Sequence, residues 1–283
     1  MAIKKVGIVG FGQMGSSIAV VCAQAGVQVI GRDIEQKYVQ KGIAFIESYF
    51  ARSVEKGKMS QADKDAALSR VSGTTDIKDL AACDLIIEAV LERLDLKRAV
   101  FAELDKVIPA NVVLATNTSD LSVIDIAMAT NRPDKVVGTH FFNPPTIMKL
   151  VEVARTIATS DDTIQVARDF CKQIGKEPVL AKDTPGFIVN RLGTPFMLEA
   201  VRMLENGLAT RDDIDNAVKL GLNHPIGPLA LLDFIGLDSV YHGATNIYEE
   251  THDPQYAPPV LMRKMVAAGW LGRKTGKGFY DYK

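Results

Sequence analysis

The sequence predicts an α/β fold with a mostly parallel sheet, followed by a smaller, all-helical C-terminal domain. Two observations support this prediction. Up to Asp183, short apolar runs alternate with longer segments of helical periodicity, which is typical of a parallel sheet covered on both faces. After the break at Thr184-Pro185-Gly186, helical patterns follow one another without a strong strand pattern. Since 283 residues suit about two domains, we predict domains at 1–184 and 185–283.

The predicted strands are short and rich in β-branched residues, as buried parallel strands are. They cover residues 6–9, 27–30, 85–90, 112–116, 136–140 and 149–153. Apolar residues at helical spacing predict the helices of the first domain at 16–25, 34–56, 59–68, 93–107 and 163–174. Because the helices at 34–56 and 59–68 follow each other directly, we expect a helical hairpin inserted into the sheet order.

The second domain shows helical patterns at 188–206, 211–220 and 260–268, and a further helix is expected to begin near Gly236.

Composition excludes several classes of protein. Thirty-three Lys plus Arg against thirty-four Asp plus Glu give a net charge of −1, which argues against a nucleic-acid partner held by bulk positive charge. The charge-free run at 6–31 resembles a membrane anchor, but its repeated glycines and glutamines predict no transmembrane segment and no membrane partner. Three cysteines without a CxxC motif indicate reduced thiols in the cytoplasm. Four histidines without clustered spacing indicate no metal site.

The first functional signal is the motif Gly10-Phe11-Gly12-Gln13-Met14-Gly15, which follows a predicted strand and opens a predicted helix. In a Rossmann-like fold, Gly10 makes the tight turn, Gly12 lets a pyrophosphate approach the backbone, and Gly15 lets helix and strand pack closely. Asp33, at the end of the second strand, suits the ribose hydroxyls and favours NAD over NADP. The neighbouring Arg32 keeps NADP as an alternative, because a guanidinium can bind the 2′-phosphate.

The second signal is His140, which ends the predicted strand at 136–140, where ligands bind in open parallel sheets. Glu152 lies on the next predicted strand and can reach the imidazole. A carboxylate on one ring nitrogen fixes the tautomer, and the other nitrogen can then exchange a proton with a substrate hydroxyl. A structural histidine at a strand end is the alternative reading.

Polar residues follow two further elements. Asn117-Thr118-Ser119 ends the strand at 112–116, where it can bind a carbonyl group or form a turn that caps the next helix. Asn190, at the start of the second domain, can reach the cleft between the domains or simply cap a helix.

With these residues in place, the chain resembles the L-3-hydroxyacyl-CoA dehydrogenase family over residues 6–280. It is most similar to the single-function bacterial members that act on 3-hydroxybutyryl-CoA. The segments that carry the resemblance are VGIVGFGQMGSSIA, IIEAVLERLDLK, LATNTSDLSV, GTHFFNPP, MKLVEV, DTPGFIVNR and GRKTGKGFYDY. Two positions depart from the family pattern. Asp120 follows Ser119 where a small residue is commoner, and Gly31 replaces a larger apolar residue.

The resemblance implies specific roles. His140 is the general acid or base, Glu152 orients and charge-stabilises it, Ser119 binds the substrate 3-oxygen or the cofactor edge, and Asn190 holds a substrate carbonyl oxygen. The cofactor-binding residues implied by the family are Gly10, Gly12, Gly15, Asp33, Glu92, Lys97, Asn117, Ser119 and Asn143. The helical hairpin would meet coenzyme A, which gives Lys56 a role with its phosphates, although Arg52 and Lys58 are equally available and a solvated helix end is the alternative.

The implied activity is reversible hydride transfer between a short-chain (S)-3-hydroxyacyl-CoA and NAD, by a homodimer that needs no metal. The resemblance also implies that the domain at 185–283 contributes to the substrate cleft and to dimerisation. Two alternatives remain. One is a related dehydrogenase of a free hydroxy or sugar acid, which would have no use for Lys56. The other is a non-catalytic nucleotide-binding protein, for which Ser119, His140, Glu152 and Asn190 would be unnecessary.

Overall fold

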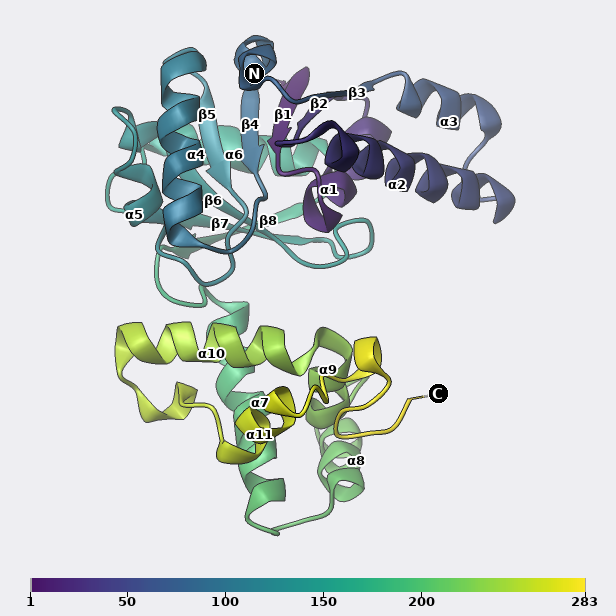
Figure 1. Cartoon of the computed structure of the whole chain (residues 1–283), viewed down its shortest axis with the longest axis vertical. Helices are drawn as coiled ribbons and strands as arrows, with labels where there is room; N and C mark the ends of the chain where they lie inside the picture. The colour runs from purple at the N-terminus through teal and green to yellow at the C-terminus, as the bar shows by residue number, and fades with distance from the viewer. Residues whose placement is uncertain (1, 283) are drawn as a thin grey trace. The chain divides into compact units, whose positions relative to one another are not determined.

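The computed structural model describes residues 2–282, and the chain divides into two compact units, Met1–Thr184 and Pro185–Lys283. Unit 1 is built on an eight-stranded sheet of order β3-β2-β1-β4-β5-β6-β7-β8 (Figure 1). The strands are β1 Lys5–Val9, β2 Gln28–Arg32, β3 Val71–Thr74, β4 Leu85–Glu88, β5 Val113–Thr116, β6 Val136–Phe141, β7 Leu150–Arg155 and β8 Glu177–Lys182. All neighbours pair in parallel except β6 and β7, which are antiparallel, so the predicted mostly parallel sheet is confirmed.

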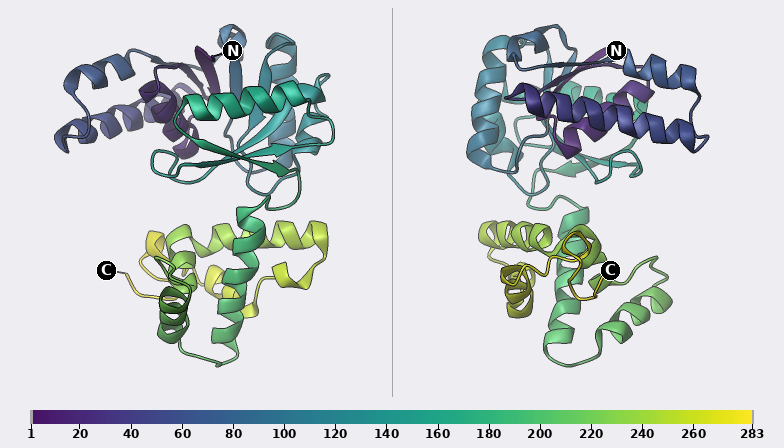
Figure 2. Two further views of the ribbon diagram at one scale, coloured as in Figure 1. Left: turned by 180° about the vertical axis from the view of Figure 1, so that it is seen from behind. Right: turned by 45° about the vertical axis from the view of Figure 1, so that its right-hand side comes forward.

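Helices cover both faces of this sheet, α4 and α5 on one face and α1 and α6 on the other (Figures 1 and 2). The bounds are α1 Gln13–Gln24, α2 Gln36–Glu55, α3 Gln61–Leu68, α4 Leu94–Val107, α5 Val123–Ala127 and α6 Asp161–Gln173. Two short 3₁₀ helices, η1 Ile77–Ala82 and η2 Pro133–Lys135, complete the unit. Helix α1 begins at Gln13, three residues before the sequence prediction, so Gly15 lies in its first turn.

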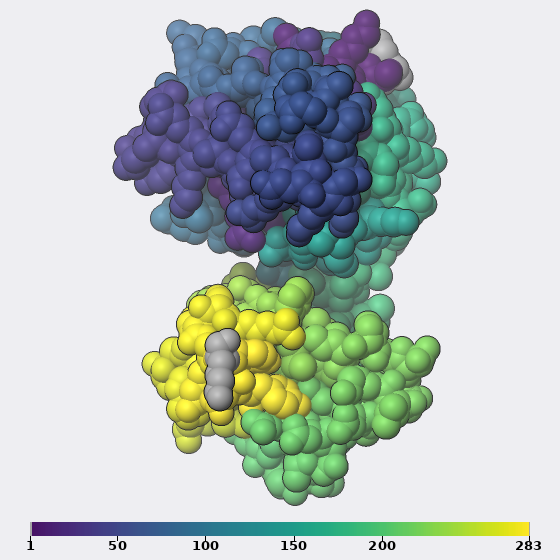
Figure 3. All heavy atoms as spheres, turned by 90° about the vertical axis from the view of Figure 1, so that its right-hand side faces the viewer, coloured from purple at the N-terminus to yellow at the C-terminus, as the bar shows by residue number. Residues whose placement is uncertain are grey.

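The predicted helical hairpin is present as α2 and α3, and it covers much of the face turned toward the viewer in Figure 3. Val39, Ile46 and Phe50 give α2 one buried stripe, and its exposed residues are mostly polar, with Tyr38 and Phe45 as exceptions. The hydroxyl of Ser60 accepts a hydrogen bond from the N–H of Asp63 and so caps α3. The hairpin is therefore anchored along a single apolar stripe.

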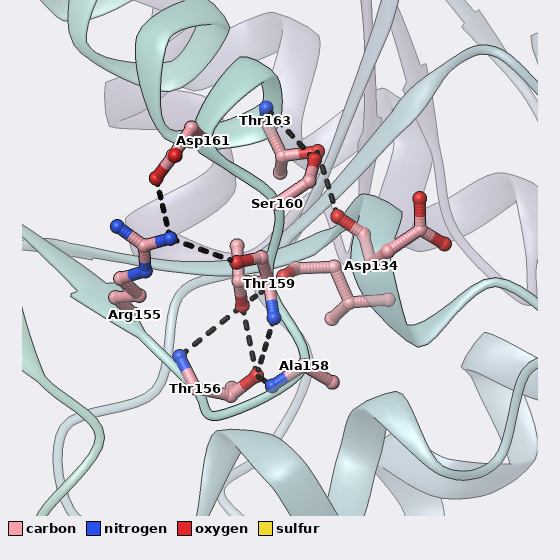
Figure 4. Close-up of polar contacts among 9 residues, drawn as sticks. Asp134, Arg155, Thr156, Ala158, Thr159, Ser160, Asp161 and Thr163 are labelled. Carbon is pink, nitrogen blue, oxygen red and sulfur yellow. Dashed lines mark hydrogen bonds and ion pairs between the residues drawn. The ribbon is translucent and has the colours of Figure 1, made fainter.

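The turn between β7 and α6 holds the sheet at the amino end of β6, away from the carboxyl ends of the parallel strands (Figure 4). The hydroxyl of Thr159 donates to the carbonyl of Val136, the first residue of β6, at 2.8 Å, and accepts from the N–H of Thr156 at 3.1 Å. Arg155, the last residue of β7, forms an ion pair with Asp161 at the start of α6. These contacts tie β6 and β7 together, which helps to hold their register.

Unit 2 is helical, as predicted. It contains α7 Val189–Glu205, α8 Arg211–Gly221, α9 Pro228–Ile235, α10 Leu237–Thr251, η3 Pro254–Tyr256, α11 Val260–Ala267 and η4 Arg273–Thr275. Its core packs apolar residues of α7, α9, α10 and α11 together with Phe279 from the C-terminal tail. The sequence did not predict α9, which begins with Pro228 at its first position. In the part of the chain that the structure describes, no helix is long and apolar enough to span a membrane.

Candidate active site

The glycine motif lies between β1 and α1, and its three glycines answer three different constraints. Gly10 has φ +91°, and a Cβ there would lie 2.6 Å from the carbonyl oxygen of Ala89. A Cβ on Gly15 would lie 1.9 Å from the carbonyl oxygen of Gly10. The space around a Cβ on Gly12 is open within 4 Å. The first and third glycines are therefore required by backbone packing, whereas the second keeps the start of α1 accessible.

Asp33 ties the end of β2 to this motif. Its Oδ2 accepts a hydrogen bond from the N–H of Phe11 at 2.9 Å, and its Oδ1 accepts one from the N–H of Ile34 at 2.7 Å. A carboxylate has about four lone-pair positions, so both oxygens keep the capacity to accept from a ligand.

The Phe11 side chain explains why glycine occupies position 31. The ring is buried, and a Cβ on Gly31 would lie 2.3 Å from ring atoms of Phe11. A Cβ on Gly42 of α2 would lie equally close to the ring. A larger residue at position 31 and the Phe11 ring cannot occupy this space together.

Glu88, the last residue of β4, is a fully buried carboxylate that sequence reasoning missed. Its Oε1 accepts hydrogen bonds from Lys97 Nζ and from the N–H of Val90, both at 2.7 Å. Its Oε2 accepts from the hydroxyl of Thr116 at 2.6 Å. The signal in the sequence was a single carboxylate within the apolar run at 85–90.

Lys97 and Glu92 extend this network toward the surface. The Lys97 side chain has no exposed surface, and its ammonium lies 3.2 Å from Glu92 Oε2. The other oxygen of Glu92 accepts hydrogen bonds from the N–H of Ser119 at 2.8 Å and from the Thr118 hydroxyl. The Glu92 side chain is one-third exposed, so of these two implied cofactor residues only Glu92 reaches solvent.

The segment after β5 carries Asn117 and Ser119. Asn117 Oδ1 accepts a hydrogen bond from the N–H of Phe141 at 2.9 Å, which links the ends of β5 and β6. The cap of the following helix α5 is Ser122, and Asp183 accepts from the first two N–H groups of α5. The alternative for Asn117 to Ser119 is therefore confirmed as a turn, since the Thr118 hydroxyl accepts from the N–H of Leu121 at 3.1 Å, but it is wrong as the cap of the next helix. Burial raises the pKa of Asp183 above its usual range.

His140 and Glu152 are directly opposite each other across the antiparallel pair β6–β7. Directly opposed side chains point to the same face of a sheet. His140 Nδ1 lies 2.7 Å from Glu152 Oε2, and both side chains are almost completely buried. The ring of Phe142 lies against the imidazole, with 4.4 Å between ring centroids. The structure therefore brings this predicted pair together.

The loop between β6 and β7 carries Asn143, whose Oδ1 lies 3.5 Å from Nε2 of Gln13 in α1. The buried ammonium of Lys176 holds the same loop by donating to the carbonyls of Pro145 and, at 2.8 Å, Met148. Burial lowers the pKa of Lys176. Sequence reasoning missed Lys176 because nothing in its neighbourhood in the sequence marks it.

Two further predicted residues belong to other elements of the chain. Asn190 belongs to unit 2, where it lies in the first turn of α7. The cap of that helix is Ile188, so the alternative of Asn190 as a helix cap is wrong. Lys56 is the exposed C-cap of α2 in the helical hairpin. In residues 2–282, no cluster of His, Cys, Asp and Glu has the arrangement of a metal site.

Comparison with known proteins identifies the family. The family model described as "3-hydroxyacyl-CoA dehydrogenase, NAD binding domain" matches residues 5–184, and that described as "3-hydroxyacyl-CoA dehydrogenase, C-terminal domain" matches residues 186–282. The chain belongs to the 3-hydroxyacyl-CoA dehydrogenase family. It is therefore an NAD-dependent oxidoreductase, as the resemblance implied.

Named relatives agree over nearly the whole chain. A 3-hydroxybutyryl-CoA dehydrogenase of Mycobacterium tuberculosis is 44% identical over 283 residues, covering 99% of each chain. The mitochondrial hydroxyacyl-coenzyme A dehydrogenase of Mus musculus is 43% identical, covering 99% of this chain and 92% of its own. The crystal structure of (S)-3-hydroxybutyryl-CoA dehydrogenase from Ralstonia eutropha has a TM-score of 0.96 at 47% identity and covers 100% of both chains.

The residues of unit 1 fit the family's cofactor. Helix α1 begins at Gln13, its N-cap residue Gly12 provides no side-chain cap, and the space beside Gly12 is open. The first N–H groups of a helix have no intrahelical partner, and together with the helix dipole they suit a pyrophosphate. Asp33, at the end of β2, suits ribose hydroxyls and would repel a 2′-phosphate.

Proposed function

We propose that this dehydrogenase interconverts a short-chain (S)-3-hydroxyacyl-CoA, 3-hydroxybutyryl-CoA, and the corresponding 3-ketoacyl-CoA, with His140 as general acid and base. The observation that supports this best is the 2.7 Å contact between His140 Nδ1 and Glu152 Oε2 at the end of β6. The names of the bacterial relatives support the choice of substrate.

The chain's own residues have a limited set of tasks in this reaction. NAD, when bound, supplies the ring that accepts the hydride from C3 of the substrate. On oxidation, Nε2 of His140 takes the proton of the 3-hydroxyl. Glu152 holds the tautomer through Nδ1 and stabilises the imidazolium that results. On reduction, the same nitrogen returns the proton to the 3-oxygen.

Other residues bind and orient the ligands in this proposal. Ser119 binds the 3-oxygen or the nicotinamide edge, and Asn190 holds a carbonyl oxygen of the substrate. Glu92, Asn117 and Asn143 contact the nicotinamide ribose and amide. Gly10, Gly12, Gly15 and Asp33 hold the pyrophosphate and the adenine ribose. The exposed position of Lys56 is compatible with binding the phosphates of coenzyme A.

We further propose that unit 2 contributes to substrate binding and forms a homodimer interface. Large apolar side chains stand exposed on its surface, among them Leu192, Leu220, Leu222 and Phe234. Light scattering at micromolar concentration tests this, and a monomer mass would contradict it. We propose a cytoplasmic location because the three cysteines are free, as is usual in a reducing compartment.

One assay tests the substrate and the cofactor together. Initial rates are measured with NADH and NADPH on acetoacetyl-CoA, on longer 3-ketoacyl-CoA thioesters and on free acetoacetate. We expect turnover of acetoacetyl-CoA with NADH, and little turnover of the free acid or with NADPH. A preference for free acetoacetate would favour a free hydroxy-acid dehydrogenase, and efficient use of NADPH would give Arg32 the role that we assign to Asp33.

A further inference from the structure

Glu88 combines complete burial with a charged partner, and no step of the proposed reaction uses it. Three groups donate to its two oxygens, from three different parts of unit 1: Lys97 on α4, Thr116 at the end of β5 and the backbone of Val90. Glu88 therefore connects the ends of two neighbouring strands with the helix that follows β4.

The second contact of Lys97 leads from Glu88 to the surface. The Lys97 ammonium lies between two carboxylates, 2.7 Å from Glu88 Oε1 and 3.2 Å from Glu92 Oε2. Only Glu92 of these three side chains has exposed surface. Glu92 also accepts from the N–H of Ser119 at 2.8 Å, so its position determines where the 117–119 segment lies.

Charge balance makes Glu88 decisive for this arrangement. A buried ammonium without sufficient counter-charge is strongly unfavourable. With Glu88 absent, Glu92 would be the remaining carboxylate for Lys97 and would be drawn toward it. That movement would weaken the contacts of Glu92 with Ser119 and Thr118. With Glu88 present, its carboxylate balances the charge of the Lys97 ammonium, and Glu92 keeps its contacts with Ser119 and Thr118.

We propose that Glu88 is a positioning residue for cofactor binding, which acts through Lys97 to hold Glu92 and the 117–119 segment. This inference rests on the cofactor role proposed for Glu92. It also gives Lys97 an indirect role, since its fully buried side chain acts on the cofactor through Glu92.

A double-mutant cycle with Glu88→Gln and Lys97→Met tests the proposal, with NADH affinity measured by fluorescence titration. We expect Glu88→Gln to raise the Kd of NADH about ten- to a hundredfold. In the Lys97→Met background, Glu88→Gln should have no further effect, because Glu88 acts through Lys97. An unchanged Kd in Glu88→Gln, or an undiminished effect in the Lys97→Met background, would overturn the proposal.

Thermal unfolding without cofactor separates positioning from stability. We expect each single variant to unfold at a lower temperature and the double variant to recover, because it has lost both buried charges. The Kd of the double variant should stay raised, because Glu92 has then lost its 3.2 Å contact with the Lys97 ammonium. A double variant that regains both stability and affinity would show a purely structural pair.

Two controls complete the experiment. Glu103→Gln/Lys106→Met changes an exposed Glu and Lys of the same helix α4 and should alter neither quantity. Glu92→Gln should raise the Kd of NADH as Glu88→Gln does. An unchanged Kd in Glu92→Gln would contradict the cofactor role of Glu92 itself, and the positioning route with it. A raised Kd in Glu92→Gln beside an unchanged Kd in Glu88→Gln would overturn the positioning role alone.

Discussion

The two units both bury carboxylates, but they satisfy them with different partners. Among residues 2–282, unit 1 buries Glu88 and Glu152, and each contacts a side chain that can carry positive charge. Glu88 pairs with Lys97, and Glu152 contacts the imidazole of His140. All four side chains lie on β4, α4, β6 or β7, around the edge where the glycine motif also lies.

Unit 2 buries Asp215 and Asp233, and their hydrogen bonds come from neutral donors. Asp215 accepts from two backbone N–H groups at the start of α9 and from the Tyr280 hydroxyl at 2.9 Å. Asp233 accepts from the N–H groups of residues 279 and 280 and from the Tyr282 hydroxyl. These contacts fasten the C-terminal tail to α8 and α9.

The difference teaches that burial alone does not mark a functional carboxylate. A carboxylate held by backbone N–H groups satisfies donors that the fold would otherwise leave unpaired. A carboxylate held against an imidazole or an ammonium controls a charge or a proton, which is what chemistry requires. We therefore expect changes in unit 1 pairs to affect binding or turnover, and changes in the unit 2 aspartates to affect stability.

The largest effect is expected for His140→Gln, which removes the group that exchanges the substrate proton. General acid–base catalysis contributes roughly 10²–10⁴-fold, so kcat should fall by that factor, as measured by NADH oxidation with acetoacetyl-CoA. The Kd of NADH should stay within a few-fold of the wild-type value. His242→Gln, at an exposed position of α10, is the matched control. Normal turnover in His140→Gln would remove this residue from the mechanism.

A smaller loss is expected for Glu152→Gln, in which the amide can still accept from Nδ1 of His140 but carries no charge. We expect kcat to fall about ten- to a hundredfold, through lost stabilisation of the imidazolium. The double variant with His140→Gln should lose no more than His140→Gln alone, since Glu152 acts on the imidazole. Additive losses in the double variant would show that Glu152 acts independently of His140.

The comparison predicts the opposite outcome for Asp233→Asn in unit 2. One oxygen that accepts backbone hydrogen bonds becomes an amide donor, so a buried N–H loses its acceptor. The free energy of unfolding should fall by about 1–3 kcal/mol, measured by denaturant titration. The activity of the folded fraction should not change. Asp281→Asn, at an exposed position of the C-terminal tail that Asp233 holds, should change neither quantity. A loss of kcat in folded Asp233→Asn would contradict the distinction between the units.

Much of the fold was predictable because its strong signals are local. Strands β1, β4 and β6 are almost wholly buried, and their apolar runs are visible in the sequence. The two edge strands were missed for a physical reason. In β3 every residue is at least partly exposed, and no apolar run marks it. In β8 the apolar run of residues 178–181 is short and begins with a proline, which argues against a strand. Helix α9 was also missed, because the first N–H groups of this helix donate to Asp215 of α8 and not to a neighbouring residue in the sequence.

Site residues could be predicted where the residue type itself indicates the chemistry. They were much harder to predict where the role depends on contact with a partner residue. His140 and the glycine motif could be found from the sequence because their positions follow predicted strands. The contact of His140 with Glu152 depends on an antiparallel register that the spacing permits without requiring. Glu88 was read as part of an apolar strand, because only the folded chain places Lys97 beside it.

The smallest effect is expected at Lys176 and concerns the pH dependence of stability. Like the aspartates of unit 2, Lys176 is a buried ionisable group held by the backbone, in this case by carbonyl groups. Burial lowers its pKa in the folded chain. Between that lowered value and the ordinary lysine value, the unfolded chain binds a proton that the folded chain does not. This contribution to stability therefore grows as pH rises through the window and is lost as pH falls through the folded value.

Lys176→Met should remove this dependence, so that the wild-type chain gains stability relative to the variant as the pH rises toward 10. Unfolding by denaturant at several alkaline pH values measures the slope, with Lys172→Met on the exposed side of α6 as control. Both thiols stay protonated in this window, because burial raises the pKa of Cys171 to about 12 and that of Cys22 still further. If Lys176→Met instead lowers kcat as strongly as Glu152→Gln, a buried charge held only by carbonyl groups affects turnover. The chemical type of the partner would then not distinguish functional buried charges from structural ones.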